Sequence, residues 1–133
     1  MKYISKEGKN KGTIVFIHGN SSSSNVFSEV LNEKLIGCSL IAIDLPGHGD
    51  SLDNHFEDFS FENLKSICTN FINTIDGDIL IYGNSFGGNI AIEIAKDINN
   101  LKGLIIAGTP PVKKPLNLLE AYLPLPPKIS KTA

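Results

Sequence analysis

The chain has 133 residues, of which 41% are hydrophobic and 20% charged, a balance that is ordinary for one globular domain and excludes a largely disordered chain. The formal net charge of −2 provides no basic surface for a nucleic acid or an anionic membrane. Charged residues near the N-terminus interrupt the apolar stretch that a signal peptide needs, and no apolar run approaches the roughly 18 residues of a membrane span. We therefore expect a cytoplasmic protein that binds neither nucleic acid nor membrane.

Five segments are predicted to be β-strands. Residues 3–5 form a short edge strand, and four apolar runs follow at 13–17, 38–43, 78–82 and 103–107. The run at 13–17 shows no alternation of polar and apolar residues, which indicates a strand covered on both faces.

Helices are predicted between these strands. In the first, apolar residues recur at helical spacing, at Val26, Phe27, Val30, Leu31 and Leu35. Ser24 or a neighbouring serine would cap this helix, and Gly37 would end it. A second helix runs from 61 to 75 with Ser60 as its N-cap, and a third from 86 to 98. Because strands alternate with helices, we expect an α/β fold with a mostly parallel sheet and flanking helices.

Two cysteines, Cys38 and Cys68, lie in a predicted strand and a predicted helix. They are not spaced as CxxC, and no histidines are arranged around them. The sequence therefore predicts two buried, reduced thiols, which fit the cytosol, rather than a disulfide or a metal site. No metal and no cofactor are predicted.

Ser85 stands between glycines where the run at 78–82 meets a helical pattern. A serine in a sharp turn with positive φ needs neighbours without Cβ atoms, and Gly83 and Gly87 meet that need. Gly88 would let the following helix pack close to the strand. The GxSxG pattern is weak alone, but its place between a strand and a helix indicates a nucleophile elbow rather than a glycine-rich turn with an idle serine.

Three motifs now stand in order along the chain: His18-Gly19-Asn20, Asp44-Leu45-Pro46-Gly47-His48-Gly49-Asp50-Ser51 and Gly83-Asn84-Ser85-Phe86-Gly87-Gly88. With them the sequence resembles the α/β-hydrolase superfamily, specifically its single-domain esterase and C–C hydrolase-like members. The likeness covers nearly the whole chain but only about the first half of the family's fold, so it implies a truncated α/β-hydrolase fold. Residues 1–108 would be the N-terminal core with the elbow. Residues 109–133, which hold six of the seven prolines and a short helical pattern at 116–122, would begin the lid.

The resemblance also implies roles for single residues. Ser85 would be the nucleophile, and the backbone N–H groups of Phe86 and Asn20 would form the oxyanion hole. His18 and Gly19 would shape the loop near the site. The expected reaction is hydrolysis of an ester, thioester, amide or C–C bond in a small acyl-type substrate, although the sequence separates neither hydrolase from acyltransferase nor one substrate from another.

The loop after the run at 38–43 is expected to be architectural. Its glycines, Gly47 and Gly49, would supply positive φ, and Asp44 would bond to the local backbone. His48 has a second reading, as a proton-transfer group, for which the sequence gives no support.

The other two members of a serine triad do not follow Ser85 in this sequence. All three histidines, His18, His48 and His55, precede it, whereas the superfamily order is serine, acid, histidine. After residue 107 no carboxylate occurs until Glu120. An unassisted serine hydroxyl is a poor nucleophile, so we expect this chain alone to be nearly inert.

Three explanations are left open by the sequence. The chain is a fragment of a longer protein, which we favour, or one part of a split enzyme whose C-terminal half is a second chain. Alternatively, it is a degenerate half-fold that acts as a non-catalytic binding or assembly module. In each case the strand at 103–107 is expected to be an exposed apolar edge that recruits a complementing half or associates with itself.

Overall fold

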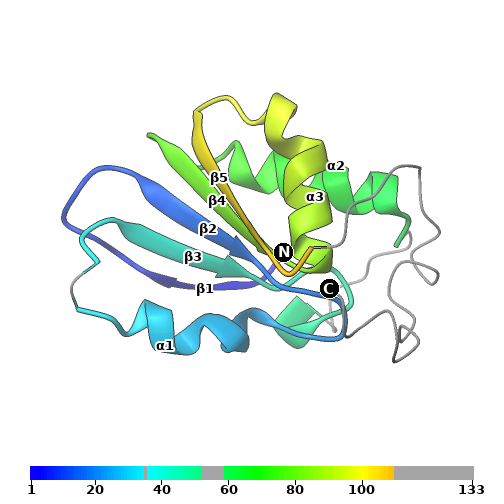
Figure 1. Ribbon diagram of the computed structural model, residues 1–133, viewed down its shortest axis with the longest axis horizontal. Helices are drawn as coiled ribbons and strands as arrows, with labels where there is room; N and C mark the ends of the chain where they lie inside the picture. The colour runs from blue at the N-terminus through cyan, green and yellow to red at the C-terminus, as the bar shows by residue number, and fades with distance from the viewer. Residues whose placement is uncertain (35, 52–58, 110–133) are drawn as a thin grey trace.

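The computed structural model describes residues 1–34, 36–51 and 59–109, and these residues form a five-stranded sheet in the order β1-β3-β2-β4-β5 (Figure 1). The strands are β1 (Tyr3–Lys6), β2 (Thr13–Ile17), β3 (Ser39–Ile43), β4 (Ile79–Asn84) and β5 (Leu101–Ala107). Strand β1 pairs antiparallel with β3, and the other neighbours are parallel. The predicted α/β fold with a mostly parallel sheet and a short edge strand is therefore confirmed.

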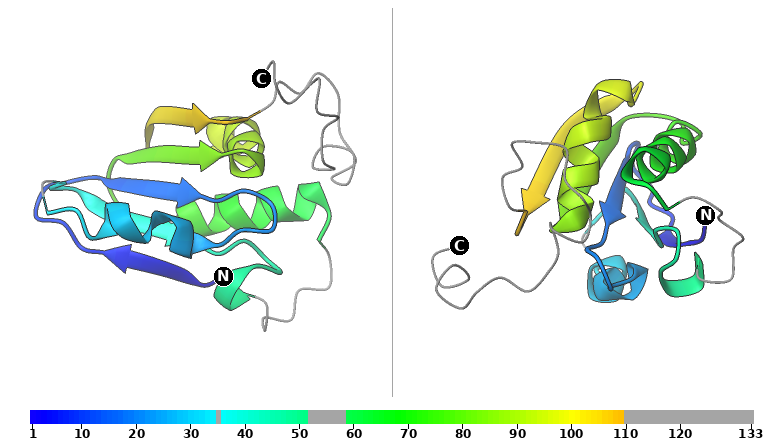
Figure 2. Two further views of the ribbon diagram at one scale, coloured as in Figure 1. Left: turned by 60° about the horizontal axis from the view of Figure 1, so that its bottom comes forward. Right: turned by 90° about the vertical axis from the view of Figure 1, so that its right-hand side faces the viewer.

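The two faces of the sheet carry two apolar cores. Helices α2 (Phe61–Ile72) and α3 (Phe86–Ile94) cover one face of the sheet (Figure 2). There they pack on side chains such as Val15, Ile17 and Ile81. The opposite face carries Phe16, against which the short helices η1 (Ser24–Phe27) and α1 (Ser28–Leu31) pack. Burial on both faces explains why β2 reads as an uninterrupted apolar run.

The first helix is shorter than the sequence predicts. It consists of one 3-10 turn and one α-turn, ends at Leu31 rather than at Gly37, and leaves Val26 58% exposed. The chain beyond it is held by the β1–β2 connection, because Lys6 Nζ donates to Glu33 O at 2.6 Å and Asn10 N–H donates to Gly37 O at 2.9 Å. Leu35 lies outside the described residues.

The second and third helices begin where they are predicted and end earlier. Ser60 caps α2 by accepting from Asn63 N–H at 3.2 Å, and the helix ends at Ile72, three residues before Ile75. Helix α3 gives way at Ala95–Asp97 to a 3-10 turn, η3. The helical pattern at 116–122 lies outside the described residues.

The cysteines are free, as expected. Cys68 is fully buried in α2, and this burial raises the pKa of its thiol to about 12. Cys38 lies just before β3 and is only half-buried, so the prediction of two buried thiols is wrong for it.

Within the described ranges no three His, Cys, Asp or Glu side chains are grouped as metal ligands, and no helix is long and apolar enough to cross a membrane.

The carboxyl ends of β2, β3, β4 and β5 lie along one edge of the sheet, because these four strands are parallel. The segments that begin at His18, Asp44, Ser85 and Gly108 therefore emerge side by side. In open α/β sheets this edge is where ligands bind.

Candidate active site

Ser85 occupies a strained turn between β4 and α3. Its φ of 54° and ψ of −118° are accessible almost only to glycine, and Ser21 is the one other non-glycine residue in the described part of the chain with positive φ. The positive φ predicted for the elbow serine is thus observed. Strain of this kind costs on the order of 1–3 kcal/mol and persists where the surrounding structure enforces it.

The glycines around Ser85 enforce this turn by close backbone contact. A Cβ on Gly83 would lie 2.6 Å from the carbonyl oxygen of Gly87 and 2.7 Å from Cα of Gly88, so β4 and the first turn of α3 are in direct contact. A Cβ on Gly87 would overlap the carbonyl oxygen of Ile17 at the end of β2. The elbow is therefore in direct backbone contact with two strands, β4 and β2.

The contact at Gly87 brings the loop after β2 to the serine. A Cβ on Gly19 would lie 3.3 Å from Ser85 Cβ and 3.8 Å from Ser85 Oγ. Asn20 follows, and the loop then turns through Ser21, whose φ is 57°, with Ser22 N–H donating to Gly19 O at 3.3 Å. Two segments far apart in sequence, 19–20 and 85–86, are thereby neighbours.

His18 fixes the shape of that loop. The ring is fully buried, Leu45 N–H donates to its Nε2 at 3.1 Å, and its Nδ1 lies 2.6 Å from Gly19 O. Because Nε2 accepts, the proton of the neutral ring is on Nδ1, which donates to Gly19 O. Both ring nitrogens therefore have partners in the loops, Nδ1 in the loop after β2 and Nε2 in the loop after β3.

Burial also lowers the pKa of His18 below its ordinary 6.5, because desolvation penalises the imidazolium. The hydrogen bond to Gly19 acts in the opposite direction and is the weaker influence. The neighbouring His48, whose ring centroid is 5.1 Å away, lowers the pKa further, and Asp44 raises it. The folded chain therefore holds His18 neutral at pH values where the unfolded chain protonates it.

This difference predicts acid sensitivity that begins near pH 6.5. Because the pKa is lower in the folded state, the unfolded state binds more protons below pH 6.5. The free energy of unfolding therefore decreases as the pH is lowered, by up to about 1.4 kcal/mol per pH unit. Urea unfolding between pH 7.5 and 5 should show a steeper loss for the wild type than for His18→Gln, which cannot titrate. Equal slopes in the two proteins would contradict this assignment.

The loop after β3 is organised by Asp44, which is buried. Its Oδ1 accepts from Ser24 N–H at 2.7 Å and its Oδ2 from Asp50 N–H at 3.2 Å, while its own carbonyl accepts from Ser51 Oγ at 2.8 Å. A Cβ on Gly49, which has φ of 50°, would overlap the carboxylate. The predicted local backbone bonding of Asp44 is therefore observed, and it also reaches η1.

His48 connects this loop to Asn20. Its Nδ1 lies 3.1 Å from Pro46 O and its Nε2 lies 3.3 Å from Asn20 Oδ1. Both ring nitrogens therefore face oxygens of the two loops. This geometry supports a role in loop structure and gives none to His48 in proton transfer at Ser85.

Neither histidine within 1–34, 36–51 and 59–109 is hydrogen-bonded to the hydroxyl of Ser85. The ring nitrogens of His18 and His48 have the partners given above, all of them in the loops after β2 and β3. Glu93 of α3 lies 3.7 Å from Lys65 Nζ on the helical surface. His55 and Glu120 lie outside the described residues.

One residue near Ser85 is missed by sequence reasoning. Thr109, assigned to the start of the lid region, donates through Oγ1 to Ser85 O at 2.9 Å. The neighbouring backbone is also linked, because Ser85 N–H donates to Ala107 O at 2.8 Å. No local pattern marks Thr109, since its partner is 24 residues away and only the parallel pairing of β4 with β5 brings them together.

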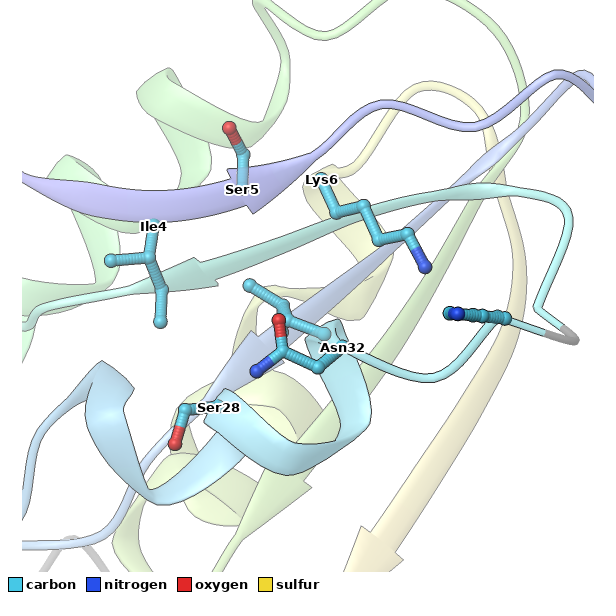
Figure 3. Close-up of a pocket in the computed structure, with 7 residues that line it drawn as sticks. Ile4, Ser5, Lys6, Ser28 and Asn32 are labelled. Atoms are coloured by element: carbon cyan, nitrogen blue, oxygen red, sulfur yellow. The ribbon is translucent and has the colours of Figure 1, made fainter.

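A cavity of about 540 Å³ lies elsewhere, between β1 and α1 (Figure 3). Ile4 and Lys6 border it from the strand, and Ser28 and Asn32 from the helix and the turn that ends it. It contains none of the site residues and is not part of the candidate active site.

Comparison with known families and sequences gives a consistent result. A family model described as the alpha/beta hydrolase family matches residues 14–132. Protein phosphatase methylesterase 1 of Bos taurus is 28% identical over an alignment of 142 residues, and the alignment covers 97% of this chain and 37% of that protein. The 2-succinyl-6-hydroxy-2,4-cyclohexadiene-1-carboxylate synthase of Klebsiella pneumoniae is 33% identical over 100 residues, covering 74% of this chain and 38% of that protein.

Solved structures agree with the sequence comparison. The N-acyl homoserine lactonase AidH, solved with N-butanoyl homoserine, has a TM-score of 0.72 and 36% identity over 83% of this chain and 41% of its own. MenH from S. aureus has a TM-score of 0.72 and 26% identity over 84% of this chain and 44% of its own. The chain thus spans about two fifths of the length of these relatives.

Proposed function

Because the chain belongs to the α/β-hydrolase family, we propose that it carries the nucleophile of a serine hydrolase acting on a small acyl-type substrate. The observation that carries this proposal is the strained conformation of Ser85 at the end of β4, beside the Gly19–Asn20 loop. The bond cleaved is of the ester, thioester, amide or C–C type. The methylesterase and lactonase among the similar proteins favour an ester.

In the proposed reaction Ser85 Oγ adds to the substrate's carbonyl carbon while its proton passes to a general base. The carbonyl electron pair moves onto the oxygen, which gains a full negative charge. The N–H groups of Phe86 and Asn20 would stabilise that charge, and loss of one such donor costs about 3 to 4 kcal/mol in a known case. Expulsion of the protonated leaving group gives an acyl-serine, which water, or another acceptor in an acyltransferase, then cleaves.

We propose that the general base and its acid come from outside this chain, in a C-terminal half that completes the sheet. All three histidines of the sequence precede Ser85, and the chain covers about two fifths of its relatives. Within the described residues β5 pairs only with β4, and its Leu104 and Ile105 are 37% and 47% exposed. An apolar sheet edge of this kind favours a complementing strand or self-association.

The proposal places the protein in the cytosol and includes no cofactor, nucleic acid or membrane. The free thiols of Cys38 and Cys68 support a reducing compartment.

The second candidate function is a non-catalytic binding or assembly module. It is favoured by one observation, that no base within the described residues bonds to the Ser85 hydroxyl. In such a module the strained elbow would be retained without activation.

A fluorophosphonate probe, which phosphonylates activated serines, separates the two candidates. Applied to cells that produce the protein, it should label the tryptic peptide 66–96, and the label should disappear in Ser85→Ala. The matched control is Ser66→Ala, which removes an exposed serine of α2 from the same peptide. Absence of labelling in the native protein would reject the hydrolase in favour of the module.

A further inference from the structure

We propose that Thr109 is a positioning residue for the oxyanion hole, acting through the peptide unit that joins Ser85 to Phe86. This inference rests on the proposed function, because it concerns the donor that Phe86 supplies there. It assigns a role to a residue that lies two positions beyond β5 and outside the three sequence motifs.

The first step is the identity of the atom that Thr109 holds. Its Oγ1 lies 2.9 Å from Ser85 O and 3.4 Å from Ala107 O. Both neighbours are carbonyl oxygens, so the single hydroxyl proton is donated, and the shorter contact is to Ser85 O. The same oxygen also accepts from two amides of α3, Gly88 N–H at 2.9 Å and Asn89 N–H at 3.4 Å, so Thr109 is its donor from the segment that follows β5.

The second step is the rigidity of the peptide unit. Ser85 C=O and Phe86 N–H belong to one planar trans peptide, in which the two bonds point in opposite directions. A donor that fixes the carbonyl oxygen therefore fixes the direction of Phe86 N–H as well. Bonding at the carbonyl also polarises the amide and strengthens the N–H as a donor.

The third step is that the fold leaves space for this contact. A Cβ on Gly88 would overlap Thr109 Oγ1 and lie 3.1 Å from Ile106 Cγ2. Gly108, with φ of 60°, turns the chain between Ala107 and Thr109. The glycine at 88 thus does more than let α3 approach β4, because it leaves room for the hydroxyl that bonds to the elbow.

Two substitutions test the inference. Thr109→Val keeps the shape of the side chain and removes the donor, whereas Thr109→Ser keeps the donor and removes a methyl group. In the native protein we expect the second-order rate constant for fluorophosphonate labelling at Ser85 to fall about fivefold to tenfold in Thr109→Val, which is the ratio that one ordinary hydrogen bond represents. In Thr109→Ser we expect the rate constant to return to within about twofold of the wild-type value. Urea unfolding of both variants shows whether the fold is kept.

A second readout does not depend on activity. In NMR spectra of the isotopically labelled 133-residue chain, Thr109→Val should shift the Ser85 carbonyl carbon and the Phe86 amide signals, and Thr109→Ser should restore them. Normal labelling in Thr109→Val, or signals at 85–86 that match the wild type, would overturn the inference. If the wild type itself is not labelled, the proposed function fails, and the NMR result alone decides whether Thr109 controls this peptide.

Discussion

Under the proposed function, replacing Ser85 by alanine is expected to lower the kcat of the native protein about a millionfold, the loss seen when the nucleophile of a triad enzyme is removed. The physical reason is that the proposed acyl-serine could not form, while the proposed oxyanion donors of Phe86 and Asn20 would be kept. Alanine has the same backbone preferences as serine at φ of 54°, so the free energy of unfolding should change little. Steady-state turnover of an activated ester, with a pre-steady-state burst measurement, checks both the rate and the covalent intermediate.

The control for this prediction is Ser66→Ala, which makes the same chemical change at an exposed position of α2. It should retain wild-type turnover and the burst. A Ser85→Ala protein that kept more than a small fraction of wild-type turnover would show that another residue is the nucleophile.

Replacing Gly87 by alanine is expected to destabilise the chain by about 3 kcal/mol or more. The added Cβ would overlap the carbonyl oxygen of Ile17, and backbone on both sides of that contact cannot rotate away as a side chain can. Helix α3 would have to move off the end of β2. Urea unfolding of the 133-residue chain measures the loss, and the same displacement should abolish labelling of Ser85, because Gly19 would no longer lie beside it.

Gly103→Ala is the matched control, since it adds the same methyl group inside β5. There the new Cβ would lie 3.2 Å from Leu80 Cδ1, the flexible end of a side chain, and the change should cost less than about 1 kcal/mol. Equal losses in the two variants would show that the close approach at Gly87 is not what holds the elbow.

The sequence predicts those parts of the fold that depend on local pattern. Strands β2 and β3 are continuous apolar runs, and the elbow needs glycine at 83 and 87 for reasons of backbone space that the structure reproduces. The N-cap at Ser60 is likewise a local hydrogen bond. The strands, Gly83 and the N-cap are each determined within a few residues of themselves, whereas the need for glycine at 87 also comes from the carbonyl of Ile17, far away in the sequence.

Features that depend on tertiary contact are not predicted. The first helix ends at Leu31, and the carbonyls of Glu33 and Gly37 in the following segment accept hydrogen bonds from Lys6 and Asn10, which are far away in the sequence. The role of Thr109 depends on the pairing of β4 with β5 in the same way.

In the candidate site, too, local features can be predicted from the sequence and tertiary contacts cannot. The elbow and its glycines can be found by motif, whereas the bonds of His18 to both Gly19 and Leu45 appear only in the folded chain. The direction of the His18 pKa shift is equally beyond the sequence, because it follows from complete burial of the ring.

The most direct test of the central claim is a crystal structure of the native protein after reaction with a fluorophosphonate. The account predicts phosphorus bonded to Ser85 Oγ, with the phosphoryl oxygen at hydrogen-bond distance, about 2.7–3.1 Å, from the backbone nitrogens of Phe86 and Asn20. Phosphorus on a different side chain, or a phosphoryl oxygen directed away from both nitrogens, would contradict it.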